Sequence, residues 1–317
     1  MRSYVPAHFS IADPWSYFCP MQYIGYFFTR LLTGFVGLFP FRALFGLSDA
    51  LAFLLYRVIG YRRAVVRGNL EFCFPEKNKA EIDDLVRRAY RNLADVTLES
   101  VKGISMSIPE LRRRYALRNA EVVNDLLASG RSVILTGSHC CNWEWGVITF
   151  AGWFKGHTIG VYKPMSNRLV ERWTNARRGR NGLILKSTKD AFKSVEQYRD
   201  DPAVFFMLAD QSPSNRMRAH WVKFFKRPTA WLHGVGEIAA RENYPIVYYE
   251  VIRRKRGFYD IVFTEIVDQP ASFSPGQITA RYVAFLEQQV RRQPGDWLWS
   301  HKRWKMNPEG NEVFFEA

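Results

Sequence analysis

Two residues five positions apart, His139 and Glu144, carry the side chains that general acid–base chemistry uses. The apolar run from Ser132 to Leu135 predicts a short buried strand, and Thr136-Gly137-Ser138 ends it with residues typical of turns. His139 is therefore expected just past the end of a strand, in the turn that precedes a helix.

A capped helix start after His139 allows the two side chains to meet. Asn142 can accept a hydrogen bond from a first-turn amide, which predicts a helix beginning near Trp143 with Glu144 inside its first turn. On one continuous helix, five residues would separate the two side chains by about 140°, because each residue turns about 100°. With His139 in the turn, Glu144 is expected to accept the imidazole proton and leave the other ring nitrogen facing a cleft, which predicts an oriented general base. The alternative is a structural histidine beside a glutamate favoured by the helix dipole.

The segment GSHCCNWEWG, residues 137–146, resembles the His-x4-Asp/Glu motif of glycerolipid and lipid A acyltransferases. It is most similar to the late acyltransferases of lipid A biosynthesis, the lauroyl/myristoyl transferase family. In that family the histidine deprotonates an acceptor hydroxyl and the acid orients it, so the resemblance implies these catalytic roles for His139 and Glu144. Cys140-Cys141 departs from the family, which more often has an aromatic residue and a glycine there.

The resemblance extends from about Arg62 to Pro308. It is carried by four further segments: RR-x-VV-x-x-NL-x-x-x-FPEK at 62–77, Tyr-Arg-Asn-Leu at 90–93, Phe-Phe-x-x-Pro-Thr-Ala at 224–230, and the Trp-rich stretch at 297–304. The last segment contains His301, which we expect to be structural because the base is already assigned.

Further substrate-binding residues are implied by the same resemblance. Lys163 matches a Tyr-Arg/Lys-Pro element that lines the site, and Arg177 matches a downstream arginine that holds phosphate, for which a planar guanidinium is well suited. Asp210 follows a predicted strand at Val204 to Leu208, at the strand end where open α/β sheets place their sites. Asn142 and Arg180 complete the expected substrate-binding set.

Composition indicates a folded chain with an anionic partner. The 317 residues are 47% hydrophobic, and 45 Lys and Arg against 30 Asp and Glu give a net charge of +15. The four cysteines lack Cys-x-x-Cys spacing, which argues against a zinc site or a disulfide framework and favours a reduced, cytosol-facing location. Cys140 or Cys141 as an acyl-carrying nucleophile is an alternative, although buried packing is the more common role of free cysteine. No metal or other cofactor is expected.

The N-terminal region, residues 1–60, is expected to associate with a membrane. Met1 to Ser10 lacks the features of a signal peptide. Met21 to Pro40 is aromatic-rich, but Arg30 would cost about 2.5 to 3.5 kcal/mol at the centre of a bilayer, so we predict a helix lying in the interface, with an ordinary buried helix as the alternative. The aromatic and apolar residues expected in the lipid boundary are Tyr23, Tyr26, Phe27, Phe28, Leu31 and Phe35. A second apolar helix is predicted over Phe41 to Ile59, interrupted by Ser48-Asp49.

Strands and helices alternate after Ser132, which predicts an α/β fold with a mixed sheet flanked by helices, preceded by an N-terminal helical membrane-associating region. We expect this region to span residues 1–60 and an acyltransferase domain to span 61–317. Pro245 to Ile252 and Phe258 to Ile266 predict a hairpin whose basic tip, residues 253–257, is solvated or faces anionic lipid.

The resemblance implies an O-acyltransferase of lipid A and lipopolysaccharide biosynthesis at the cytoplasmic face of the inner membrane. It would move a fatty acyl chain from an acyl carrier protein thioester to a hydroxyl of an anionic lipid A precursor. Acyl-CoA-dependent acylation of another glycolipid or of a lysophospholipid is the alternative. A binding module of a membrane or a nucleic acid is a third reading, but no nucleic-acid recognition motif accompanies the charge, so no nucleic-acid partner is expected.

Overall fold

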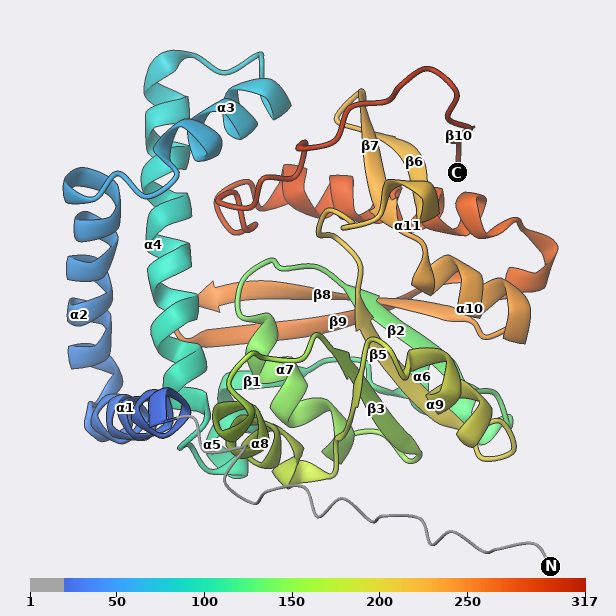
Figure 1. Ribbon diagram of the computed structural model, residues 1–317, viewed down its shortest axis with the longest axis horizontal. Coiled ribbons are helices and arrows are strands. Elements are labelled where there is room, and N and C mark those ends of the chain that lie inside the picture. The colour runs from blue at the N-terminus through green and yellow to red at the C-terminus, as the bar shows by residue number, and fades with distance from the viewer. Residues whose placement is uncertain (1–19) are drawn as a thin grey trace, which may run out of the picture.

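A seven-stranded sheet forms the centre of the computed structural model, which describes residues 20–317 (Figure 1). The strand order is β1-β9-β8-β2-β5-β3-β4, and all neighbours run parallel except the β8–β9 hairpin. The predicted mixed sheet is confirmed. Its strands are β1 (Tyr115–Leu117), β2 (Val133–Gly137), β3 (His157–Tyr162), β4 (Ile184–Ser187), β5 (Ala203–Leu208), β8 (Ile246–Lys255) and β9 (Phe258–Val267).

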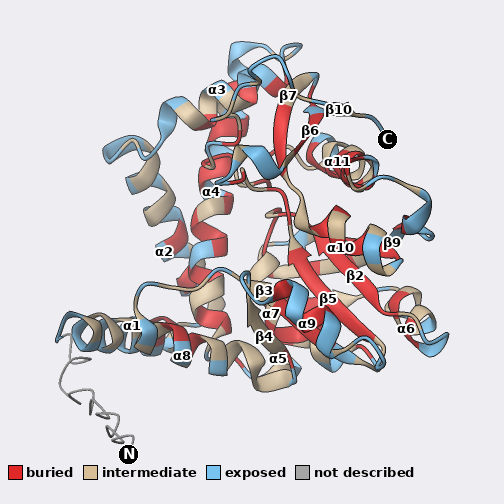
Figure 2. Cartoon of the chain, turned by 45° about the vertical axis from the view of Figure 1, so that its right-hand side comes forward, coloured by how far each residue is buried: buried red, intermediate tan, exposed pale blue. Residues whose placement is uncertain are grey.

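Helices cover both faces of this sheet, because its central strands are apolar on both sides. On β2 and β5, Ile134 and Phe205 pack with one buried cluster, whereas Leu135 and Phe206 pack with the other. The first cluster includes residues of α9 (Ala191–Gln197), α10 (Gly234–Glu242) and α11 (Pro275–Arg292). The second includes residues of α5 (Ile108–Arg114), α6 (Glu121–Ala128) and α7 (Trp143–Thr149). Figure 2 shows the buried central strands between these layers.

A small second sheet packs beyond α11 and was not expected. It has the order β10-β6-β7, formed by β6 (Ala219–Phe224), β7 (Arg227–Leu232) and β10 (Phe314–Phe315). Helix α8 (Arg168–Arg178) and four short helices complete the elements after residue 114. The short helices are η3 (Phe150–Gly152), η4 (Gly179–Asn181), η5 (Arg216–Arg218) and η6 (Pro270–Ser272).

The long helix α4 (Lys79–Gly103) connects the N-terminal helices to the sheet. It begins at a capping box made by Asn78 and Glu81. Its far end packs tightly on α7, since a Cβ at Gly103 would lie 2.6 Å from Nε1 of Trp145. In addition, the Trp145 indole donates a hydrogen bond to the Glu99 carbonyl at 2.9 Å. Thus α4 supports the segment that follows β2.

The N-terminal helices pack against α4, with α2 beside it and α1 across its lower end (Figure 1), and they expose much apolar surface. They are α1 (Pro20–Leu38), α2 (Phe41–Phe53), the π-turn η2 (Leu54–Val58) and α3 (Arg63–Cys73). The predicted interruption of the second helix at Ser48-Asp49 is wrong, because α2 runs through it and Ser48 donates a buried hydrogen bond to Asp95 at 2.6 Å. Met1 to Ser10 and Cys19 lie outside the described residues, and the domain boundary at residue 60 stays a prediction.

Within residues 20–317, each helix taken alone is too short or too polar to cross a membrane. Only the segments Phe41–Val58 and Arg63–Cys73, which meet at a 92° bend, reach the required length and hydropathy when taken as a pair.

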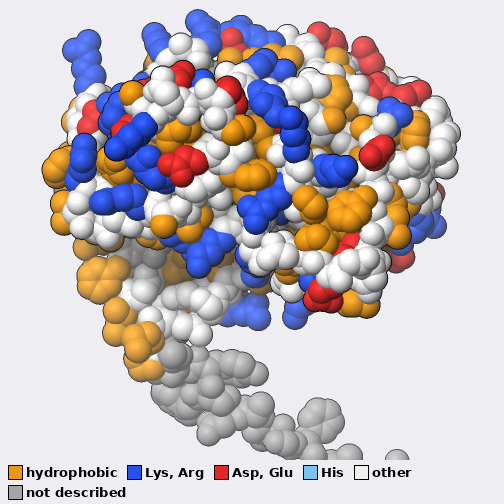
Figure 3. All heavy atoms as spheres, turned by 90° about the horizontal axis from the view of Figure 1, so that it is seen from above, with side chains coloured by type: hydrophobic (Ala, Val, Ile, Leu, Met, Phe, Trp, Pro, Cys, Tyr) orange, Lys and Arg blue, Asp and Glu red, His pale blue; other side chains and the backbone are white. Residues whose placement is uncertain are grey.

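Basic side chains are abundant on the surface, but several form ion pairs with acidic residues of the same chain. On the face shown in Figure 3, Lys and Arg side chains exceed acidic ones, with hydrophobic side chains between them. The expectation of a solvated or lipid-facing hairpin tip is wrong for Arg253 and Arg256. Arg253 bonds Asp296 at 3.2 Å and Arg256 bonds Asp95 at 2.6 Å, because the end of the hairpin packs against α4.

Candidate active site

The turn after β2 is held in place by the C-terminal part of the chain. The Tyr282 hydroxyl donates to the Gly137 carbonyl at 2.9 Å, and the Ser138 hydroxyl donates to Gln289 of α11 at 2.8 Å. Cys141 has a positive φ of 50°, and its amide donates to the Asp296 carbonyl at 2.9 Å. The chain thus reverses within a few residues and presents the imidazole of His139 beside the start of α7.

Asn142 caps α7 as the sequence predicts. Its side-chain oxygen accepts from the Trp145 amide at 3.1 Å, and its amide group donates to the Glu99 carboxylate at 2.8 Å. Asn142 is fully buried and does not line the cavity beside His139, so the structure gives it a positioning role instead of the expected contact with substrate.

Asp210 is the carboxylate that binds the imidazole. It follows β5, the parallel neighbour of β2, and its Oδ1 lies 2.5 Å from Nδ1 of His139. Its Oδ2 accepts from the His139 backbone amide at 2.8 Å and from the Trp297 indole at 2.9 Å. Burial would raise the pKa of Asp210, but the charge and hydrogen bonds of His139, with the Trp297 bond, lower it. The carboxylate is therefore ionised, and Nδ1 must carry the proton that joins the two groups.

The structure corrects the expected hydrogen bond between His139 and Glu144. Glu144 instead accepts from Arg178, the last residue of α8, at 2.7 Å. Two parallel strands bring Asp210 under the imidazole, whereas the first turn of α7 directs Glu144 toward α8. Glu144 still lines the same cavity as His139 and acts on it through charge.

The imidazole is tuned to hold a proton more readily than a free histidine. Burial would lower the pKa of His139, but the nearby charge of Asp210, its hydrogen bond and the charge of Glu144 together raise it. The side chain of His139 is 15% exposed, and its Nε2 lies 3.2 Å from the amide nitrogen of Gln211. Because Nδ1 is protonated, Nε2 carries the lone pair and can accept a proton.

A cavity of about 590 Å³, here called the His139 cavity, opens beside this nitrogen. Its polar lining includes two pairs of bonded side chains, His139 with Gln211 and Glu144 with Arg178. Elsewhere its walls are mainly apolar, formed by Trp143, Val147, Val161, Met165, Leu185, Phe206, Leu208 and Leu232. A mostly apolar cavity with a few convergent polar groups is the usual form of a small-molecule site, and this one could hold an alkyl chain with its polar end at His139.

The remaining expected substrate-binding residues divide into two groups. Lys163 lines the His139 cavity, as expected. Arg177 does not reach it, and its Nε donates to the Ile104 carbonyl at 3.1 Å, while the adjacent Arg178 lines the cavity. Arg180 donates to the carbonyls of Gly103 and Met106, each at 2.8 Å, and so satisfies the end of α4.

Two residues of the C-terminal segment, His301 and Arg303, support the loop after Asp210, and sequence reasoning did not identify Arg303. His301 accepts from the Ser212 amide at 3.0 Å, and burial with the charge of Arg303 lowers its pKa to about 4, so it is neutral and structural, as expected. Arg303 is buried over the Trp231 ring at 3.9 Å and donates to Ser212 at 3.3 Å. The dense Trp, His and Arg content of 297–304 was the available signal for this role.

The two adjacent cysteines are fully buried, and burial holds the pKa of both thiols well above the usual value. A buried thiol is a poor nucleophile, so packing explains Cys140 and Cys141 better than acyl transfer through sulfur. Within residues 20–317, no set of three or more His, Cys, Asp or Glu side chains is arranged to hold a metal ion.

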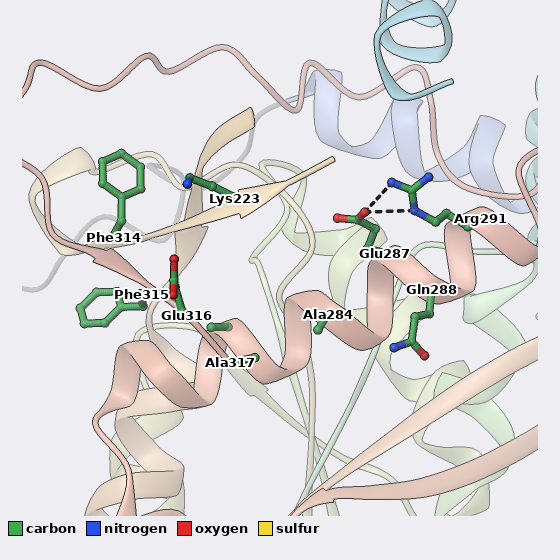
Figure 4. Close-up of a pocket in the computed structure, with 10 residues that line it drawn as sticks. Lys223, Ala284, Glu287, Gln288, Arg291, Phe314, Phe315, Glu316 and Ala317 are labelled. Atoms are coloured by element: carbon green, nitrogen blue, oxygen red, sulfur yellow. Dashed lines mark hydrogen bonds and ion pairs between the residues drawn. The ribbon is translucent and has the colours of Figure 1, made fainter. Parts of the chain in front are cut away.

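A separate hollow of about 410 Å³ lies between α11, β6 and the C-terminal residues (Figure 4). Glu287 and Arg291 form an ion pair of 2.6 Å at its wall. Of the described residues that line this hollow, none also lines the His139 cavity. It is therefore distinct from the candidate active site.

Comparisons with known proteins identify a family and several relatives. The family described as bacterial lipid A biosynthesis acyltransferase matches residues 14–306. The lipid A biosynthesis lauroyltransferase of Escherichia coli (strain K12) is 26% identical over 280 residues, which cover 86% of this chain and 88% of that protein. The lipid A biosynthesis palmitoleoyltransferase of the same organism is 22% identical over 267 residues, 80% of this chain and 82% of that protein. A lipid A biosynthesis acyltransferase of Haemophilus influenzae is 23% identical over 258 residues, 79% of this chain and 80% of that protein.

Since the family match extends over nearly the whole chain, and these relatives are acyltransferases, this protein is an acyltransferase that belongs to the bacterial lipid A biosynthesis acyltransferase family.

Proposed function

We propose that this enzyme transfers a fatty acyl chain from an acyl carrier protein thioester to a hydroxyl of a lipid A precursor. The observation that carries the proposal is a histidine whose Nδ1 is bound by a buried carboxylate while Nε2 faces a cavity with apolar walls. The named relatives transfer lauroyl and palmitoleoyl groups, which are alkyl chains of the kind such a cavity suits.

In the proposed reaction, Nε2 of His139 removes the proton of the acceptor hydroxyl as its oxygen attacks the thioester carbonyl. The C–O bond forms, the C–S bond breaks, and the proton passes to the departing thiolate. Asp210 is a positioning residue, because it fixes the tautomer in which Nε2 carries the lone pair. Negative charge on the carbonyl oxygen needs nearby donors, and Gln211 and Arg178 supply N–H groups at the cavity wall. Glu144 holds the guanidinium of Arg178 there.

A direct test supplies purified protein with a lipid A precursor and either an acyl carrier protein thioester or the matching acyl-CoA, and detects the product by mass spectrometry. Transfer from the carrier protein that disappears in His139→Ala supports the proposal. Transfer from acyl-CoA alone would favour the alternative donor. Transfer to a lysophospholipid but to no lipid A precursor would reassign the acceptor. Full activity in a folded His139→Ala variant would remove the histidine from the mechanism.

We also propose that α1 and α2 rest on the cytoplasmic surface of the inner membrane. One side of α1 exposes eight large apolar residues by 52% to 84%: Met21, Ile24, Phe27, Phe28, Leu31, Leu32, Phe35 and Leu38. Their spacing follows a helical face, which suits a helix lying in the interface. Tyr26, expected in the lipid boundary, packs instead edge-on to Trp173 of α8 at 6.5 Å.

Vesicle flotation tests this surface. Phe27→Ser/Phe28→Ser/Leu31→Ser should lose most vesicle binding, because each buried apolar side chain contributes about 1.5 to 3 kcal/mol. A triple serine variant of exposed apolar residues elsewhere, at Phe192, Met217 and Val313, removes similar side chains as a control. Equal binding by the two variants would contradict the assignment of α1.

A further inference from the structure

A second hollow of about 610 Å³ adjoins the His139 cavity and shares part of its wall. Tyr162, Lys163, Leu185 and Thr188 line both spaces. The hollow is formed by the carboxyl ends of β3 and β4, the start of α8 and the loop that leads to α9. A molecule lying in this hollow would therefore adjoin the His139 cavity along the shared wall.

Four cations from three segments surround this hollow, here called the basic groove: Lys163, Arg168, Lys186 and Lys189. Lys163 and Lys189 are exposed, and neither forms a hydrogen bond or ion pair within residues 20–317. The closest carboxylate oxygen to Arg168 belongs to Glu171 at 3.9 Å, and the arginine side chain is 76% exposed. Lys186 is half-buried and donates to Gln197 at 3.0 Å.

The two acidic residues of the groove are already engaged by neighbouring donors. Glu171 accepts from the Tyr162 hydroxyl at 2.7 Å and from the Met165 amide at 3.1 Å. Asp190 accepts from the Ser187 hydroxyl at 2.5 Å. Four cations and two carboxylates give the groove a formal charge of +2. The N–H groups that remain available to a ligand belong to the cationic side chains. Such a site selects a compact anion.

The groove also lies next to the proposed membrane surface. Asn167 caps the start of α8 and donates to the Gln22 carbonyl of α1 at 2.9 Å, so the groove end of α8 touches the helix with the exposed apolar face. A lipid with its chains in the bilayer beside α1 would hold its phosphates at about the level of this contact. An acidic protein that binds from the aqueous side would not need a groove next to α1. The position of the groove therefore favours a lipid over a protein.

From this arrangement we infer that the basic groove binds a phosphate group of the acceptor lipid while the acceptor hydroxyl lies at His139. The inference rests on the proposed function and assigns to the phosphate a site different from Arg177, whose Nε is used by the Ile104 carbonyl. Lysines provide point charges for the phosphate and Arg168 can bind it through two N–H groups.

The test compares Lys186→Ala/Lys189→Ala with a control, Lys155→Ala/Lys255→Ala, which removes the same charge from exposed positions outside both hollows. We expect the KM for the phosphorylated acceptor to rise about tenfold in the groove variant, which is the effect of losing about 1.4 kcal/mol of binding. The kcat and the KM for the thioester donor should stay near those of wild type. With acceptor that a phosphatase has treated, wild type and groove variant should have the same KM.

Two results would overturn the inference. The first is an acceptor KM that rises no more in the groove variant than in the control. The second is a rise in the donor KM instead, which would make the groove a docking site for the carrier protein.

A binding measurement separates the groove from the proposed function. Flotation with phosphatidylcholine vesicles, with and without phosphatidate, needs no turnover. Phosphatidate should strengthen vesicle binding of the wild type and of the control variant, and should strengthen binding of the groove variant clearly less. This difference should decrease at high salt, because salt screens the charges. Equal gains in all three proteins refute the groove even if transfer activity is found. A selective gain without activity on any acceptor would support the groove and refute the proposed reaction.

Discussion

Replacing Asp210 with Asn tests the geometry of the base most sharply. The Oδ2 atom accepts from two donors, the His139 amide and the Trp297 indole. An Asn side chain must place its oxygen there, because its NH2 group would face two N–H groups. Its NH2 group is then directed at Nδ1, which has to give up its proton and become an acceptor. The proton moves to Nε2, and the imidazole can no longer act as a base toward the cavity.

The expected loss follows from this tautomer change. General base catalysis contributes about 10²- to 10⁴-fold, and the same substitution in Ser-His-Asp triads costs about 10⁴-fold in kcat. We expect kcat for Asp210→Asn to fall within that range while the KM for the acceptor changes little. Asn and Asp have nearly the same volume, so the near-UV circular dichroism spectrum should show a folded protein.

The pH profile of kcat/KM gives a second readout. In wild type the rate should fall as the pH drops through the pKa of His139, which is raised above its ordinary value of 6.5. Removing the charge of Asp210 lowers that pKa, so the acidic limb of the residual activity should move to lower pH. An Asp210→Asn enzyme with turnover close to wild type and an unmoved acidic limb would refute the reasoning.

Three further substitutions probe the surroundings of His139. Glu144→Gln should lose less kcat than Asp210→Asn, about tenfold, because it removes the charge that holds Arg178 but no hydrogen bond of the imidazole; a larger loss than in Asp210→Asn would restore Glu144 as the orienting acid. Glu99→Gln should alter the pH dependence of the free energy of unfolding. Burial raises the pKa of Glu99 from 4.5 to about 7, so the folded protein binds a proton between these pH values and the wild type becomes less stable as the pH rises through them. Urea titrations of the variant should not show this loss of stability. Cys140→Ala/Cys141→Ala should keep transfer activity, with some stability lost from the core, because neither buried thiol carries the acyl group; a folded but inactive double variant would reinstate a thioester intermediate.

Local signals predicted the parts of the site that depend on neighbouring residues. The strand before His139, the Asn142 cap and the start of α7 follow from residue types within about ten positions, and the structure has all three. The partner of the imidazole could not be found this way, because Asp210 is 71 positions away and reaches His139 only through the pairing of β2 with β5. The family resemblance, together with its place after a strand, implied that Asp210 is a site residue, but its role as the partner of His139 was not predicted.

The sequence prediction chose Arg177 where the structure has Arg178 at the cavity, an error of one position on a helix. Arg177 and Arg178 point in directions about 100° apart on α8, so the choice between them decides which one meets Glu144. The hairpin of β6 and β7 was missed for two reasons. β7 contains Pro228, and the positive-φ turn between the strands is made by Phe225 and Lys226 instead of the Asn and Gly typical of such turns.

The indole of Trp297 bound to Asp210 has a consequence for biosynthesis. A nascent chain that has emerged only as far as α11 already contains both parallel strands and the imidazole, yet its carboxylate lacks this donor, and the Cys141 amide lacks the carbonyl of Asp296. The site is therefore complete only after the segment around Trp297 has been synthesised and has docked. A chain that stops before this segment would leave Asp210 and the turn after β2 without these two supports, even if its sheet assembled.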